Sequence, residues 1–148
     1  MKLRKAVLED LPVLNRISVT AKKHWGYPNE WIERWLDDLT LTPTDLEEQS
    51  ILVAENREGS LGFCAIKEEA EYVEINHLWI LPEFIGKGFG KRLLEAALQK
   101  FSSSQKPIQV VADPNAALFY QKQGFVTFKQ IESFPKGRFL PVMEKRKS

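Results

Sequence analysis

Three glycines alternate at the point where an apolar strand runs into a long helix. They are Gly86, Gly88 and Gly90. Glycine tolerates positive φ and carries no side chain, so a turn of this kind lets backbone amides approach a ligand closely. The first turn of the helix adds amides without partners and a partial positive charge. The pattern predicts a phosphate-binding turn between strand and helix, and a flexible helix cap is the alternative interpretation.

Cations gather at the same turn, and they favour the phosphate-binding interpretation. They are Lys87, Lys91 and Arg92. Two common nucleotide-binding motifs do not fit. A dinucleotide-binding G-x-G-x-x-G fingerprint needs glycine at Lys91 or Leu93, and a P-loop needs glycine at Ile85 and Ser or Thr at Arg92.

Composition limits the other options. A chain of 148 residues suits one domain, residues 1–148. With 21 Lys+Arg against 20 Asp+Glu, the net charge of +1 gives no reason to expect a nucleic-acid partner. One cysteine (Cys64) and two histidines (His24 and His77) argue against a disulfide and a metal site. Without a targeting segment or a long apolar run, no membrane partner and a cytoplasmic location are expected.

Hydrophobic periodicity predicts the order β-α-α-β-β-β-α-β-α-β-β. The strands are expected from Leu3 and over 50–55, 61–67, 72–80, 108–112, 125–132 and 139–143. The helices are expected over about 9–24, from a cap at Asn29, after the glycine turn, and over about 115–123. This order predicts an α+β, three-layer domain with a mixed, mostly antiparallel sheet of about seven strands and four helices. The one strand–helix–strand crossover should make 72–80 and 108–112 parallel neighbours.

Two segments together resemble the GNAT superfamily of N-acetyltransferases. In the first, Trp79-Ile80-Leu81-Pro82 leads into the glycine turn as in the motif Q/R-x-x-G-x-G/A, although Ile85 replaces the usual Gln or Arg. In the second, residues 113–125 are similar to N-x-x-A-x-x-F-Y-x-x-x-G-F. The element order agrees with this family over essentially the whole chain.

The resemblance implies a GNAT-like fold and direct transfer of an acetyl group from acetyl-CoA, the co-substrate, to an amine, without a metal. The backbone of Leu78 and Ile80 would pair with the pantetheine arm, and that of Leu78 or its neighbour would hold the oxyanion. The cofactor-binding residues implied by the resemblance are Leu78, Ile80, Ile85, Gly86, Lys87, Gly88, Phe89, Gly90, Lys91, Asn115 and Tyr120. Asn115 is alternatively only a helix cap.

Two residues are the catalytic candidates. Tyr120 matches the family's thiolate-protonating tyrosine, with a buried aromatic residue as the alternative. Glu74 is the candidate base, because alternation along an unbroken strand puts it on one face with Leu78 and Ile80; a surface glutamate is the alternative. His77 has the opposite parity unless a bulge resets it.

The acceptor is expected to be a small-molecule or peptide amine. Trp25 and Tyr27 are candidates for an aromatic wall, and Arg138 for a contact with an acceptor carboxylate, whereas Trp31 and Trp35 have the spacing of a core helix face. The sequence is also compatible with a homodimer. Two other functions also remain: a catalytically silent acyl-CoA-binding or regulatory domain, and an unrelated phosphate-binding domain.

Overall fold

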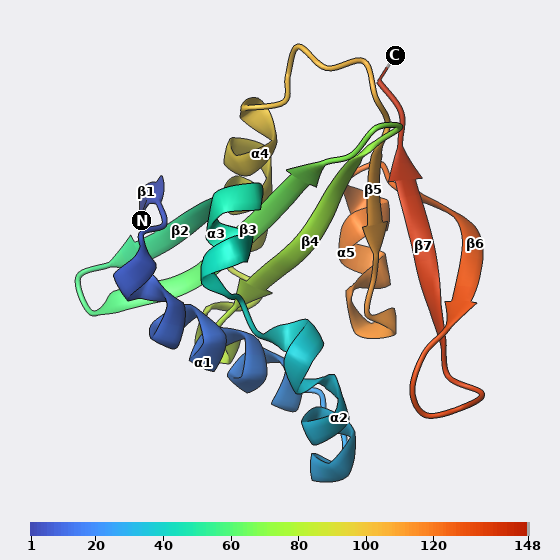
Figure 1. Ribbon diagram of the computed structural model, residues 1–148, viewed down its shortest axis with the longest axis horizontal. Helices are drawn as coiled ribbons and strands as arrows, with labels where there is room; N and C mark the ends of the chain where they lie inside the picture. The colour runs from blue at the N-terminus through green and yellow to red at the C-terminus, as the bar shows by residue number, and fades with distance from the viewer. Residues whose placement is uncertain (148) are drawn as a thin grey trace.

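The computed structural model, which describes residues 1–147, contains one sheet and helices on both of its faces (Figure 1). The strands are β1 (Lys2–Lys5), β2 (Ser50–Asn56), β3 (Gly59–Glu68), β4 (Val73–Ile80), β5 (Ile108–Val111), β6 (Val126–Glu132) and β7 (Phe139–Lys145). The α-helices are α1 (Leu11–Lys23), α2 (Asn29–Leu39), α3 (Pro43–Glu48), α4 (Phe89–Gln99) and α5 (Ala117–Lys122). Short 3-10 turns at Leu8–Asp10, Pro82–Phe84 and Pro114–Ala116 precede α1, α4 and α5.

The sheet has seven strands in the order β1-β2-β3-β4-β5-β7-β6. Only β4 and β5 are parallel, and the other neighbouring pairs are antiparallel. This confirms the predicted mixed sheet and its one parallel crossover, which runs through α4. A crossover of this length is needed because parallel strands cannot be joined by a tight turn.

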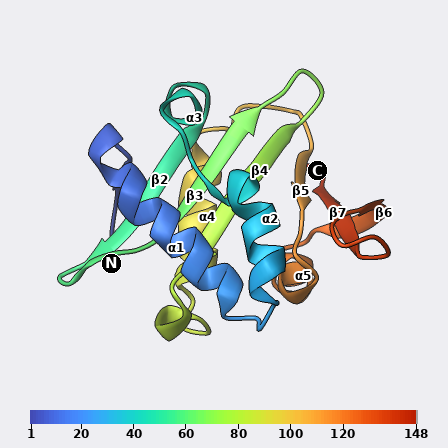
Figure 2. The same ribbon diagram turned by 60° about the horizontal axis from the view of Figure 1, so that its bottom comes forward.

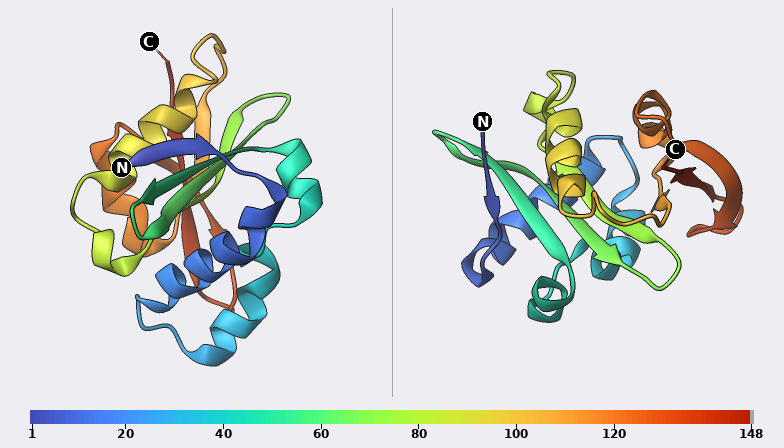
Figure 3. Two further views of the ribbon diagram at one scale, coloured as in Figure 1. Left: turned by 90° about the vertical axis from the view of Figure 1, so that its left-hand side faces the viewer. Right: turned by 90° about the horizontal axis from the view of Figure 1, so that it is seen from above.

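Helices α1, α2 and α3 cover one face of the sheet, and α4 and α5 cover the other (Figures 2 and 3). On the first face, Leu14 of α1 packs with the fully buried Val53 and Phe63. On the second, Leu93 of α4 packs with Cys64 of β3. The central strand β3 therefore buries both of its faces, as its nearly continuous apolar sequence requires.

The register of the sheet shifts in the middle of β4, as it also does between β2 and β3 and between β6 and β7. Ala65 pairs with His77 but its neighbour Ile66 pairs with Ile75, so Asn76 is an extra, bulged residue. The parallel pairing of β4 with β5 ends at the same level, at Ile75 and Val110. Beyond this point the two strands separate, and the site described below lies around the opening between them.

Three details of the sequence prediction were wrong. The structure has a fifth α-helix, α3, which begins at Pro43 behind a capping box in which Thr42 accepts from the Asp45 amide. Asn29 does not cap α2: it is the first helical residue, and Pro28 is at the cap. Helical spacing also predicts Leu36 on one face with Trp35 and Leu39, but in the structure it lies off the buried face of α2 and is 41% exposed.

Candidate active site

The glycine turn adopts the conformation that its sequence favours. Gly86 and Gly88 have φ of +81° and +84°, and Gly88 is the N-cap of α4. A Cβ at either position would have no atom within 4 Å, so the backbone here faces open space. The first amides of α4 have no acceptor within the helix. Together these features leave an exposed row of N–H groups at the positive end of a helix.

This turn forms one wall of a cavity of about 480 Å³, called the larger cavity below. Its lining includes, among others, Trp25, Leu78, Trp79, Ile80, Phe84, Ile85, Gly86, Gly88, Gly90, Lys91, Asp113, Asn115, Ala116, Phe119, Tyr120 and Lys122. The structure thus brings together all but two of the predicted cofactor-binding residues. The exceptions are Lys87 and Phe89. Phe89 packs its ring edge-on against Phe84 at 5.9 Å between centroids, and the Lys87 ammonium lies 5.8 Å from the same Phe84 ring.

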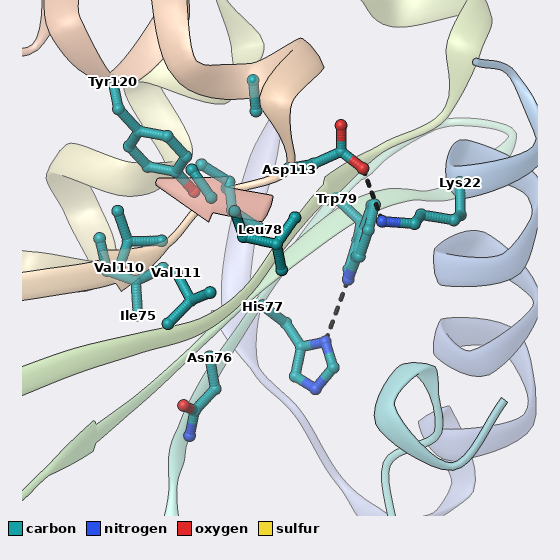
Figure 4. Close-up of a pocket in the computed structure, with 13 residues that line it drawn as sticks. Lys22, Ile75, Asn76, His77, Leu78, Trp79, Val110, Val111, Asp113 and Tyr120 are labelled. Atoms are coloured by element: carbon teal, nitrogen blue, oxygen red, sulfur yellow. Dashed lines mark hydrogen bonds and ion pairs between the residues drawn. The ribbon is translucent and has the colours of Figure 1, made fainter. Parts of the chain in front are cut away.

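A second cavity of about 130 Å³, the smaller cavity, lies around the opening between β4 and β5 (Figure 4). It is lined by Lys22, Ile75, Asn76, His77, Leu78, Trp79, Val110, Val111, Ala112, Asp113, Ala116, Tyr120 and Leu140. Five residues line both cavities: Leu78, Trp79, Asp113, Ala116 and Tyr120. The two cavities therefore meet at the place where β4 and β5 separate.

Tyr120 is at this meeting point. It comes from α5, is only 5% exposed, and packs edge-on against Phe125 at 5.5 Å between ring centroids. Burial raises the pKa of its phenol above the ordinary value, with the nearby Cys64 thiol adding to the effect. The hydroxyl consequently keeps its proton at neutral pH.

His77 also lines the smaller cavity, and the bulge at Asn76 explains why. Its Nδ1 accepts a hydrogen bond of 3.0 Å from Nε1 of Trp79, so the proton of a neutral ring belongs on Nε2. Burial lowers the pKa of His77 to about 4, although Asp45 and Asp38 act in the opposite direction. At neutral pH the side chain is a neutral donor with no free lone pair, which makes it a poor general base.

The prediction that Glu74 shares a face with Leu78 and Ile80 was wrong. The bulge at Asn76 shifts the alternation by one residue, so Glu74 lies on the face of His77, and it lines neither cavity. Burial raises the pKa of Glu74 above its usual value, and the nearby Glu69 contributes in the same direction. A raised pKa suits a base, but Glu74 lies in the part of β4 that is still paired with β5, before the opening.

A buried charge cluster that the sequence did not reveal joins the smaller cavity to three distant segments. The Nζ of Lys22 lies 2.6 Å from the Asp113 carboxylate, and the Tyr27 hydroxyl donates to the same carboxylate at 3.1 Å. Arg138, from the turn before β7, donates to the Tyr27 oxygen at 3.1 Å. Asn115 contacts Tyr27 as well, with Nδ2 3.0 Å from the hydroxyl oxygen. Helical spacing from Leu11 and Ser18 places Lys22 near the buried side of α1 and Lys23 away from it, but nothing local indicates the partners of Lys22.

Of the aromatic residues in and near α2, only some have the positions that the sequence predicted. Trp35 is buried, in agreement with its helix-face spacing, while Trp25 is 40% exposed and lines the larger cavity. Tyr27 and Arg138 are held in the charge cluster, and neither lines a cavity. The guanidinium of Arg138 therefore contacts Tyr27 and Asp113.

A family model described as an acetyltransferase (GNAT) domain matches residues 47–127, more than half of the chain. The chain belongs to this family, and it is an N-acetyltransferase. The matched region holds β4, the glycine turn and α5, which line the cavities together with residues of α1 and β7 that lie outside it.

Solved structures agree over nearly the full length. A GCN5-related N-acetyltransferase from Rhodopseudomonas palustris has a TM-score of 0.79 and 25% identity, with 99% of this chain and 95% of that chain covered. The PaiA N-acetyltransferase from Thermoplasma acidophilum, in complex with coenzyme A, has a TM-score of 0.75 and 23% identity over 99% and 98%. A ribosomal-protein-alanine N-acetyltransferase from Brucella melitensis shares the fold, with a TM-score of 0.69 and 19% identity over 99% and 100%.

Residues 1–147 contain neither a candidate membrane-spanning helix nor a candidate metal-binding group. None of the helices there is both long and apolar enough to span a bilayer. In the same part of the chain, His, Cys, Asp and Glu side chains form no group of three or more that could hold a metal ion.

Proposed function

We propose that this protein transfers the acetyl group of acetyl-CoA directly to a primary amine bound in the smaller cavity. The observation that carries the proposal is the meeting of the two cavities at Leu78 and Tyr120. A thioester reaching this point from the larger cavity would face an amine in the smaller cavity. Both reactants can then be present together, which is what a direct transfer requires.

The larger cavity suits acetyl-CoA, which supplies an activated acetyl thioester. Gly86 and Gly88 leave open space beside the N-terminus of α4, where their backbone can hold the pyrophosphate. Lys91 adds a cation, and exposed Ile85 takes the position of the usual polar residue. The related PaiA structure was solved with coenzyme A, in agreement with this use of the cavity.

The backbone of β4 supplies the next contacts. Beyond Ile75 its edge no longer pairs with β5, so amides and carbonyls around Leu78 and Ile80 are free to pair with an extended pantetheine arm. An amide of Leu78 or its neighbour then stabilises the oxyanion that forms when the amine attacks the carbonyl carbon. Such a donor is already in position and needs no rearrangement during the reaction.

Tyr120 completes the transfer. Because its pKa is raised, the hydroxyl is a protonated donor throughout the neutral range. It gives this proton to the thiolate sulfur that leaves as the carbon–sulfur bond breaks. The acceptor amine must lose a proton before it attacks, and neither Glu74 nor His77 has both the position and the free lone pair to take it. We assign this step to water in the smaller cavity.

The test is release of free thiol from acetyl-CoA in the presence of a panel of small-molecule and peptide amines. We expect saturable, amine-dependent thiol release together with acetylated product. Saturable binding of CoA without turnover of any amine would overturn the proposal in favour of a catalytically silent acyl-CoA-binding domain.

A further inference from the structure

The charge cluster beside the smaller cavity is not balanced. It holds two cations, Lys22 and Arg138, and one carboxylate, Asp113, with side chains that are 11%, 12% and 9% exposed. Arg138 reaches Asp113 at 3.5 Å and Lys22 reaches it at 2.6 Å, so both cations share one anion. The next carboxylate that acts on Lys22 is Asp38, which is exposed on α2 and is screened by solvent. Burying an unmatched charge is costly unless a partner is supplied.

Hydrogen-bond donors also outnumber acceptors here. Both oxygens of Asp113 are already used, because Oδ1 accepts from the amide and the side chain of Asn115 and Oδ2 accepts from Lys22. Trp35 Nε1 is buried and has no partner among residues 1–147. The Lys22 ammonium lies 4.6 Å from the ring centroid of Trp35. The cluster therefore lacks a negatively charged acceptor, which is the group that a ligand would have to bring.

Only one of the two cations is open to a ligand. Lys22 lines the smaller cavity, and Arg138 lines neither cavity. Figure 4 shows the Lys22 side chain reaching from α1 to Asp113 next to Trp79, on the opposite side of the cavity from Val110. Its ammonium has three donors, and Asp113 takes one of them, so donors are left for a second anion.

We infer that the acceptor of this enzyme carries a carboxylate in addition to its amine, and that Lys22 binds this carboxylate. The inference rests on the proposed function, because it names the class of amine that occupies the smaller cavity. A carboxylate at Lys22 restores the balance of two cations and two anions in the cluster. It also fixes the amine relative to the opening between β4 and β5.

The experiment compares matched acceptors in the wild-type protein. A series of ω-amino acids with two to six carbons between the two groups is assayed against alkylamines of the same length and against the corresponding amino acid amides. We expect at least one amino acid to exceed its amine and its amide about tenfold in kcat/KM, mainly through KM, since a charge-assisted contact of this kind is typically worth a factor of ten or more. The inference would be overturned if, at every chain length, the alkylamine or the amide had a kcat/KM equal to or higher than that of the amino acid.

Variants then assign the preference to Lys22. Lys22→Met keeps the volume of the side chain and leaves Arg138 to balance Asp113, so we expect a folded protein. In this variant the ratio of kcat/KM for the amino acid to kcat/KM for its uncharged partners should fall to about one. Lys22→Arg should keep the preference, and Lys23→Met, at the exposed neighbouring position on α1, is the matched control. An unchanged preference in folded Lys22→Met would contradict the inference.

A binding measurement separates failure of this inference from failure of the proposed function. Calorimetric titration of the CoA-saturated protein with butyrate and hexanoate, against butanamide and hexanamide, needs no turnover. Carboxylate binding that is lost in Lys22→Met supports the anion site even where no amine is acetylated. Where amines are acetylated but no carboxylate binds to the wild type, the proposed function stands and this inference falls.

Discussion

The two cavities that meet at Tyr120 are built in different ways. The wall of the larger cavity around the glycine turn is largely backbone, with two glycines in the left-handed region and the first amides of one helix. The smaller cavity depends on side chains from α1, β4, β5, β7 and the turn before α5. A site made from backbone conformation can be recognised from a short sequence motif. A site made from side chains of distant elements does not, because its members become neighbours only when the chain has folded.

The largest expected effect is at the residue that the two cavities share. Tyr120→Phe removes the proton donor but keeps the buried ring, so we expect kcat to fall about a hundredfold, within the usual range for a general acid, with little change in the Kd of CoA. Steady-state kinetics and calorimetry measure the two quantities. Tyr72→Phe, outside both cavities, is the matched control. An unchanged kcat in Tyr120→Phe would remove its role as the acid.

The side chains of the smaller cavity should also make stability depend on pH. His77 has a pKa of about 4 in the fold against an ordinary 6.5, so between these values the unfolded chain binds a proton that the folded chain does not. Stabilisation by the neutral ring is complete above pH 6.5 and is lost as the pH falls toward 4, by up to about 3 kcal/mol.

Urea unfolding between pH 7 and pH 4.5 measures this loss. In His77→Asn the amide oxygen can still accept from Trp79 but the side chain does not titrate, so the decrease in the free energy of unfolding should be smaller. His24→Asn, at an exposed position after α1, is the control. Parallel curves for His77→Asn and the wild type would show that His77 is not held neutral by burial.

A smaller effect is expected for glycine substitutions, which distinguish the cost of backbone strain from a loss of CoA binding in the larger cavity. Gly88 and Gly137 both have positive φ, +84° and +91°, and both have open space where a Cβ would be. Alanine at either position should cost about 1–2 kcal/mol of stability through backbone strain. Only Gly88→Ala places a methyl group at the cavity wall, so it alone should weaken CoA binding, by about tenfold. Equal CoA affinity in both variants would argue against pyrophosphate binding at this turn.

The smallest effect is expected at Glu74, and it tests the bulge. Because this carboxylate lines neither cavity, Glu74→Gln should keep kcat/KM within about twofold and leave the pH–rate profile unchanged. If Glu74→Gln instead removed an increase of the rate at alkaline pH, Glu74 would be the base. The acceptor amine would then have to bind nearer to Glu74 than the smaller cavity allows.

The fold followed from the sequence in most respects, for a clear physical reason. Alternation and helical spacing depend on which face of an element is buried, and each element carries this pattern in its own residues even where, as for α4 on β2 and β3, its neighbours are distant in sequence. The exceptions have local causes. Helix α3 is only six residues long and does not reach two full turns, and Asn29 lies one position inside the helix that it was expected to cap.

The bulge at Asn76 is the single feature that most changed the predicted site. The apolar residues change parity between Ile75 and Leu78, which is compatible with a bulge, but only pairing with β3 sets the register. That one extra residue moves His77 into the smaller cavity and separates Glu74 from the face of Leu78. The assignment of Glu74 was wrong because it extended one alternation along the whole strand.

By itself, then, the sequence determined the mixed sheet, its one parallel crossover, the glycine turn and the family resemblance, because each depends on residues that are near one another in the chain. The tertiary structure alone decided that Lys22, Asp113, Tyr27 and Arg138 form one buried cluster. Their closeness results from the packing of α1, the turn before α5 and the turn before β7, and no local pattern encodes it. The carboxylate-bearing acceptor that we propose follows from this cluster, which only the folded chain assembles.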